Sequence, residues 1–358
     1  MIKKIHSSCW LFPILYFFMV WMTMAAPNEG TDFANQIFML ESVQKMPLIF
    51  IFNENGPFLY FLVYKVLYSI IDISPRFYIA LLAFIYFSII LLMVEKMANH
   101  YNVLRLNRKS LSYLAIFTCL CYSPLYICIA RFHFAVLLVI VGVLLFILKK
   151  NKLWKILGIL ITFLAYYAHE GIMIIYAIIL LSYFLQKFWL DSIMGHNLIL
   201  RNIVVCSISI TLVVFGPLLF TSITSIMGNY NLINERYTES YVGASAGDGV
   251  YLLVLVLSLF GSILTLFITS LYDRRNNWIT AFCISGLFIM CLFYNQKFFF
   301  VQRIFMFMPL FIGLSCMQVL EDLKPSSKRL FFNFLLFSVP LIYLCQLVIQ
   351  RGIFFGLL

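Results

Sequence analysis

Arg131 and His133 stand at the start of a long apolar run, in the stretch ARFHFAVLLVIVGVLLFIL. The other end of this run is followed by Lys149, Lys150 and Lys152. Basic clusters mark the cytoplasmic ends of membrane spans, so the arginine and the histidine are expected at the outer end. Ionisable side chains at a membrane boundary are costly and usually have a function. The pair therefore predicts part of a site open to the outer leaflet, facing an anionic substrate carried on a lipid.

Three further arginines are expected on the outer side. Arg76 opens an earlier apolar run, Arg303 opens a late one within VQRIFMF, and Arg236 lies in a long late loop. Guanidinium groups pair bidentately with phosphate oxygens, so four outer arginines suit a clamp for a polyphosphate. Anchoring at lipid headgroups explains any one of them equally well. The histidine two residues after Arg131 favours a site at that position.

His169 and Glu170 lie in a short turn between two apolar runs, in LAYYAHEGIMIIY. A histidine can act as a general base or orient a sugar hydroxyl. The alternative is a polar turn closed by Gly171. Because the turn is short and its flanks are apolar, the pair is expected at membrane depth rather than in bulk water.

Asp32 and Glu54 belong to the first outer loop, in NEGTDFANQIF and IFNENGPFLYF. A carboxylate there could activate an acceptor hydroxyl or stabilise an oxocarbenium-like transition state. The alternative is a pair of solvated loop charges. No Asp-x-Asp or Asp/His grouping of the kind that binds Mg²⁺ or Mn²⁺ is evident, so no metal and no cofactor are expected.

The composition is that of a membrane protein. Of the 358 residues 63% are hydrophobic and only 11% are charged. This predicts an all-α polytopic membrane protein, with residues 1–358 forming one integral membrane domain. The net charge of +11 is scattered over short loops, which argues against nucleic acid as a partner. The nine cysteines lie mostly inside apolar runs, so neither a disulfide framework nor a zinc site is expected.

The distribution of basic residues predicts the topology. With the N-terminus inside, the C-terminus outside and an uncleaved first span, basic clusters fall at every second connection, giving about eleven transmembrane helices. The run 57–71 is short, contains Lys65 and is rich in tyrosine. It is therefore expected to be an interfacial helix within the outer loop 27–75 rather than a span. A second outer loop is expected at 221–249. The inner clusters are 96–109, 149–155, 187–201, 274–275 and 324–329.

An ordered set of segments resembles a known family. These segments are GTDF (Asp32), NENGPFLYFL (Glu54), ARFHFA (Arg131, Ala135), AYYAHEGIMIIY (His169) and VQRIFMF (Arg303). In order and length they resemble the EpsG-like, Wzy-type polymerases of bacterial O-antigen and exopolysaccharide. Members of that family commonly have a small residue four positions after the arginine, as Ala135 is here. They often have a small residue after the histidine, where this chain has Glu170.

The resemblance implies a GT-C-like glycosyltransferase in the bacterial inner membrane, with its active site facing the periplasm. Such enzymes join repeat units carried on undecaprenyl pyrophosphate into O-antigen of lipopolysaccharide, capsule or exopolysaccharide, in some cases with a chain-length regulator. The implied roles are pyrophosphate binding by Arg131 and Arg303, and general base or acceptor orientation by His169 or Asp32, with His133 in reserve. The further substrate-binding candidates are Arg76, Arg236, Glu54 and Glu170.

Two other functions fit the same features. A GT-C transferase that adds one sugar from a polyprenyl-phosphate donor would have a similar early carboxylate and interfacial helix. A lipid-linked glycan flippase would tend to carry internal repeats or charges at mid-membrane. No repeat is found, and the ionisable residues cluster at the ends of the apolar runs, so an enzyme is favoured.

Overall fold

The computed structural model describes residues 4–22, 32–53, 58–100, 108–109, 111–116, 118–119, 130–190, 197–229 and 277–293. Within these ranges the secondary structure is helical, joined by short turns, with no strand. The chain divides into two compact units. Unit 1 comprises Met1–Met173 with Tyr343–Leu358, and unit 2 comprises Ile174–Ile342. Each unit is described by itself.

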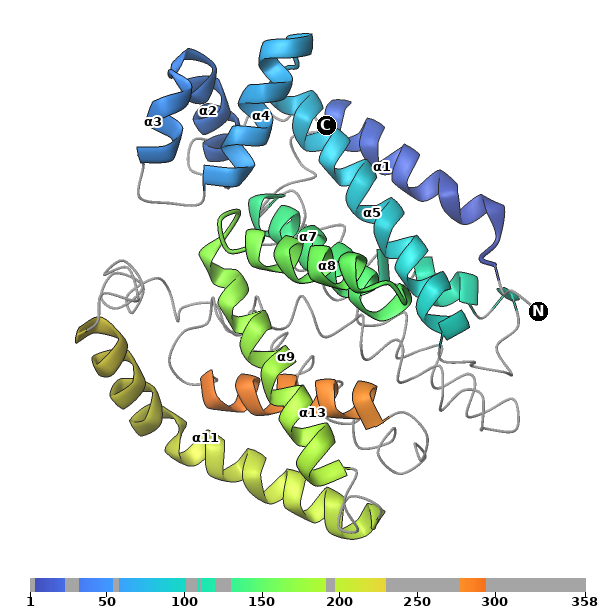
Figure 1. Cartoon of the computed structure of the whole chain (residues 1–358), viewed down its shortest axis with the longest axis vertical. Helices are drawn as coiled ribbons and strands as arrows, with labels where there is room; N and C mark the ends of the chain where they lie inside the picture. Colours follow the sequence, from blue (N-terminus) through green and yellow to red (C-terminus); the bar gives the residue numbers. More distant parts are fainter. Residues whose placement is uncertain are drawn as a thin grey trace, which may run out of the picture. The chain divides into compact units, whose positions relative to one another are not determined.

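Unit 1 is built on four helices that pack side by side in pairs, α1 with α5 and α7 with α8 (Figure 1). Three further helices, α2 to α4, precede α5 in the chain, and a 3-10 turn, η2, follows α8. The elements are η1 Ser7–Trp10, α1 Leu11–Met22, α2 Asp32–Lys45, α3 Leu48–Asn53, α4 Phe58–Ile71, α5 Pro75–His100, α7 Ala130–Leu148, α8 Lys152–Leu164 and η2 Glu170–Ile172.

Aromatic contacts set the direction of α1 against α5. Tyr16, in the first half of α1, lies 4.7 Å from Phe87 between ring centroids, and Phe17 lies 5.4 Å from Phe77. Before α1, the backbone N–H of Ile5 donates to the carboxylate of Glu95 near the end of α5. The two helices are therefore antiparallel, with the chain start beside the end of α5.

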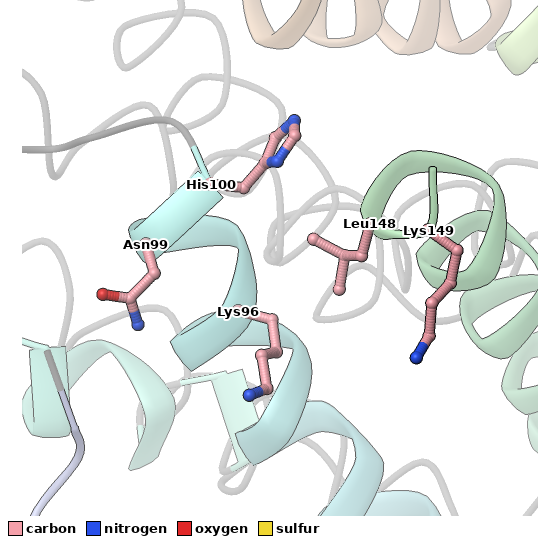
Figure 2. Close-up of a pocket in the computed structure, with 5 residues that line it drawn as sticks. All are labelled: Lys96, Asn99, His100, Leu148 and Lys149. Atoms are coloured by element: carbon pink, nitrogen blue, oxygen red, sulfur yellow. The ribbon is translucent and has the colours of Figure 1, made fainter. Parts of the chain in front are cut away.

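Helices α5 and α7 run in the same direction. The ring of Tyr86, near the middle of α5, meets the ring of His133 in the first turn of α7, with centroids 5.1 Å apart. Their last turns, at His100 and Leu148, line one hollow (Figure 2). Since α8 returns antiparallel to α7, the turn after α8 comes back to the end where α5 and α7 begin.

Residues that the positive-inside rule predicts on opposite sides of the membrane lie at opposite ends of unit 1. Lys96 and Lys149 lie at the end of unit 1 where α5 and α7 finish and α8 starts. Arg76, Arg131 and His169 belong to the opposite end, because they begin α5, begin α7 and follow α8. The directions of α1, α5, α7 and α8 agree with the predicted topology.

Two glycines allow α7 and α8 to approach closely. A Cβ added at Gly142 would meet the side chain of Thr162 and lie 2.5 Å from the carbonyl oxygen of Gly158. A Cβ added at Gly158 would lie 2.6 Å from the carbonyl oxygen of Gly142. Small residues at such crossings let helix backbones pack directly in a membrane. Asn151 caps the start of α8, its side chain accepting from the N–H of Leu153 at 2.9 Å.

Replacing Gly142 by alanine is therefore expected to destabilise the α7–α8 hairpin by about 1–3 kcal/mol, because the obstructing atoms include backbone that cannot turn away. The measurement is thermal unfolding of the purified protein in detergent. Val143→Ile is the matched control, since it adds one carbon at a half-buried neighbouring position. Equal melting temperatures for the two variants would contradict the close packing.

Unit 2 contains α9 Met173–Leu185, whose first residue closes unit 1, then one turn of π-helix, η3 Gln186–Leu190, and the helices α11 Leu198–Asn229 and α13 Asn277–Phe293. Helix α11 packs along α13. Leu190, Ala281, Ile284 and Phe288 form a buried core cluster. A buried pair of hydroxyls, Ser182 of α9 and Ser285 of α13, is joined by a 3.1 Å hydrogen bond.

Four helical stretches of the described part are long and apolar enough to cross a membrane, so this is a membrane protein. They are Pro75–His100, Ala130–Leu148, Glu170–Leu190 and Ile199–Gly216. Helix α4, with 14 residues, is about 21 Å long and too short for a hydrocarbon core of about 30 Å. Four further apolar runs count among the roughly eleven spans expected from the sequence. The runs 250–272, 304–320 and 330–349 lie outside the described residues, as does most of the run 111–129.

Candidate functional site

The first turn of α7 joins two other parts of unit 1. The guanidinium carbon of Arg131 lies 5.8 Å from the ring centroid of Phe61 on α4. The ring of Phe132 meets the ring of His169 edge to face, with centroids 5.2 Å apart. Segments from three widely separated parts of the sequence therefore meet here, and the turn that carries His169 lies directly against the start of α7.

His133 points elsewhere. It is 1% exposed, and its ring packs edge-on against Tyr86 of α5. Successive residues of an α-helix are rotated by roughly 100°, so two residues two positions apart point to nearly opposite sides. Arg131, which is half-buried beside α4, and His133 therefore do not share a face. The structure does not bring these two predicted site residues together.

The turn before His169 is fastened to the start of α4. Helix α8 ends at Leu164, and the carbonyl oxygen of Tyr167 accepts a hydrogen bond from the backbone N–H of Leu59 at 2.9 Å. The rings of Tyr167 and Phe58 also meet, with centroids 5.3 Å apart. The N–H groups in the first turn of a helix have no acceptor within the helix. Here the carbonyl oxygen of Tyr167 is the acceptor for one of them. Helix α4 is thereby held next to the histidine.

His169 is fixed by its own backbone turn. The residue is extended (φ −164°, ψ 120°) and 4% exposed, and its Nδ1 accepts a hydrogen bond from the N–H of Gly171 at 2.9 Å. A ring nitrogen that accepts this bond carries no proton, so the neutral imidazole has its hydrogen on Nε2. His169 can therefore offer an Nε2–H donor. Glu170, the next residue, is half-buried and begins η2.

Two tyrosines of α4 were not singled out as site residues from the sequence. Tyr60 and Tyr64 are fully buried. The hydroxyl of Tyr78 on α5 donates to the carbonyl oxygen of Tyr60 at 2.9 Å, and Gln44 of α2 donates to the hydroxyl of Tyr64. The four-residue spacing of Tyr60 and Tyr64, which places both on one helix face, is the signal that could have indicated them.

Both phenols stay protonated at neutral pH. Burial raises the pKa of Tyr60, and the nearby positive charge of Arg131 lowers it to a smaller extent. Burial likewise raises the pKa of Tyr64 to about 12, against the opposing hydrogen bond from Gln44. Tyr60 therefore keeps its proton beside the guanidinium group and does not serve as a base.

Neither a family model, nor a curated protein, nor a solved structure matches this chain. The site is accordingly defined by its own geometry. Arg131, Phe132 and His169, with α4 beside them, form what we term the outer cluster, completed by Tyr60 and Phe61. Its chemistry combines one guanidinium group, one neutral imidazole and one phenol, set among aromatic rings.

The remaining predicted residues are placed as follows. Arg76 is the second residue of α5, half-buried and at the same end of unit 1 as the outer cluster. Asp32 is the first residue of α2. Glu54, Arg236 and Arg303 lie outside the described residues. Among the residues that the structure describes, no group of three or more His, Cys, Asp or Glu side chains is placed to hold a metal ion.

Helix α2 is tied to the outer cluster through α4. The ammonium group of Lys65 donates to the backbone carbonyl oxygen of Gln44 at 2.6 Å. Together with the Gln44–Tyr64 hydrogen bond, this contact fixes the two helices to each other. Lys65, which indicated from the sequence that 57–71 does not span the membrane, thus holds α4 against α2.

Proposed function

We propose that this protein is a membrane glycosyltransferase that polymerises saccharide repeat units carried on undecaprenyl pyrophosphate, at the outer face of the bacterial inner membrane. The observation that supports it most is the outer cluster. Arg131, His169 and α4, which come from three of the segments that resemble the polymerase family, meet at the end of unit 1 opposite Lys96 and Lys149. A cation, a neutral donor and an interfacial helix are what a lipid pyrophosphate substrate requires at that boundary.

The proposed reaction is a displacement at the anomeric carbon. A hydroxyl of one repeat unit attacks the anomeric carbon of the chain carried on the other lipid. The new glycosidic bond forms while the bond from the anomeric carbon to the pyrophosphate oxygen breaks, and the electron pair leaves with the lipid pyrophosphate. Negative charge develops on that oxygen, so a fixed guanidinium nearby lowers the barrier. Arg131 is proposed for this role, with Arg303 as a second cation.

The proton of the attacking hydroxyl needs an acceptor. The Nδ1 of His169 already accepts the Gly171 N–H, and a neutral ring in that state has no free lone pair on Nε2. This geometry favours His169 as a donor that orients a substrate oxygen over His169 as the general base. The carboxylate of Asp32 is the proposed base. The ring of Phe61 on α4 would line the side of the site next to Arg131.

The test is a gel of the surface polysaccharide from cells with the gene deleted and then complemented. A polymerase predicts that deletion collapses the ladder to a single repeat unit on its acceptor, and that the intact gene restores the ladder. Complementation with Lys150→Ala, an exposed lysine at the opposite end of unit 1, should restore it equally well. Loss of one sugar from every band would instead identify a single-sugar transferase. Loss of all bands, with lipid-linked units accumulating inside, would identify a flippase.

A further inference from the structure

A basic hollow lies between the last turns of α5 and α7, with a volume of about 420 Å³. It is lined by Lys96, Asn99, His100, Leu148 and Lys149. Figure 2 shows Lys96 and His100 on the side of α5, with Leu148 and Lys149 facing them from the side of α7. Both helices therefore bring a lysine to this hollow, and none of its five lining residues is acidic.

The hollow lies at a membrane boundary. Helices α5 and α7 are both candidate spans, and both end here. The ammonium group of Lys149 lies 5.5 Å from the ring centroid of Trp154, which is 45% exposed at the start of α8. Tryptophan is enriched at the depth of lipid headgroups, where its ring meets both apolar chains and polar groups. The hollow is thus expected at headgroup level, with Leu148 toward the apolar side.

The acid nearest in sequence does not neutralise this charge. Glu95 precedes Lys96, but its carboxylate accepts the backbone N–H of Ile5 at 3.2 Å and so is directed toward the chain start. The side chain of Asn99 donates back to the carbonyl oxygen of Glu95 at 2.8 Å. Lys96 and Lys149 are both exposed, so their ammonium groups are accessible to a ligand.

We propose that this hollow binds the phosphate headgroup of an anionic phospholipid of the inner leaflet. Basic hollows between spanning helices on the cytoplasmic side suit such headgroups, and a lysine offers three donors to phosphate oxygens. Lys96 and Lys149 hold the phosphate from its two sides, while Leu148 contacts the apolar part of the lipid. The site is at the opposite end of unit 1 from the outer cluster and does not depend on the proposed polymerase activity.

The experiment measures lipid binding by the full-length protein in detergent, by native mass spectrometry with phosphatidylglycerol or with phosphatidylcholine. The double variant Lys96→Gln, Lys149→Gln is compared with Lys152→Gln, Lys155→Gln, which removes the same charge from neighbouring positions that do not line the hollow. A lysine near anionic lipid contributes about fivefold in affinity, so the lining variant should bind phosphatidylglycerol roughly 25-fold more weakly. The control variant should retain wild-type binding, and the difference should shrink in high salt.

Equal binding by the lining and control variants would overturn the proposal, as would equal retention of phosphatidylcholine. Displacement of phosphatidylglycerol by millimolar inorganic phosphate would also overturn it, because the ligand would then be free phosphate rather than a lipid. The variant Lys96→Arg, Lys149→Arg keeps the charge and is expected to restore binding. Restoration by arginine separates loss of the ligand from loss of the fold.

Discussion

Replacing Arg131 by methionine is expected to reduce the polymer to single repeat units, with the rate of polymerisation falling by about 100-fold or more. This is the scale of loss when one fixed group that stabilises developing charge is removed from an active site. Methionine is chosen because its unbranched chain can keep contact with the ring of Phe61, over which the guanidinium group lies. The measurement is the rate of ladder formation from isolated lipid-linked repeat units in membranes that contain the variant.

The variant Arg131→Lys separates two ways in which a cation can act on pyrophosphate. A guanidinium group presents a planar pair of donors that matches two phosphate oxygens, whereas an ammonium group is a point charge. If Arg131 grips the pyrophosphate bidentately, lysine should recover only a small part of the lost rate. Full recovery with lysine would indicate a charge that acts at a distance. Normal polymer from Arg131→Met would remove Arg131 from the site altogether.

A control must show that the fold is intact. Arg76→Met changes the same residue type at the same end of unit 1, where Arg76 is half-buried at the start of α5. Both variants should unfold at nearly the wild-type temperature in detergent, since each keeps its apolar stem. Each variant removes one arginine from the same end of unit 1. A much larger loss of polymer with Arg131→Met than with Arg76→Met would then show that the place of the arginine matters and not only the total charge.

The direction of the helices in unit 1 could be predicted from the sequence, whereas the faces of α7 could not. Charge asymmetry and run length predict that α5 and α7 run in the same direction, with one span between them, and the structure shows the two helices running so. Helix α7 is apolar on every side after His133, so no polar stripe marks the direction of its first turn. Whether Arg131 or His133 faces α4 depends on how the neighbouring helices pack, which only the structure shows.

The sequence predicted a turn at His169 but did not predict that the histidine side chain would cap it. Its place between two apolar runs predicted a position at membrane depth, which stays a prediction. In the structure the side chain is buried, 4% exposed. Helix starts are usually capped by Ser, Thr, Asp or Asn, so the sequence did not indicate that a histidine would serve as the cap. The buried contacts of Tyr60 and Tyr64 were missed for a related reason, because tyrosines at an expected membrane interface are common without any role in a site.

The two roles of His169 can be separated by two isosteric substitutions. Asparagine places an amide oxygen where Nδ1 accepts the Gly171 N–H, so His169→Asn keeps the cap but removes the Nε2–H donor. Glutamine extends an amide nitrogen to the distance of Nε2, so His169→Gln keeps a donor and loses the cap. If the Nε2–H orients a substrate oxygen, the asparagine variant should fold normally and polymerise about 100-fold more slowly.

The same comparison tests whether His169 is only structural. A capping role predicts the reverse order, in which asparagine retains the polymer while glutamine loses stability by about 1 kcal/mol. Melting temperature and polymerisation rate measured on the same preparations distinguish the two cases. The ring contact between Phe132 and His169 adds a further check, because Phe132→Leu leaves the cap in place but removes the aromatic edge that holds the imidazole. If the imidazole must be oriented as a donor, Phe132→Leu should polymerise more slowly than wild type. If His169 is only a cap, Phe132→Leu should polymerise at the wild-type rate.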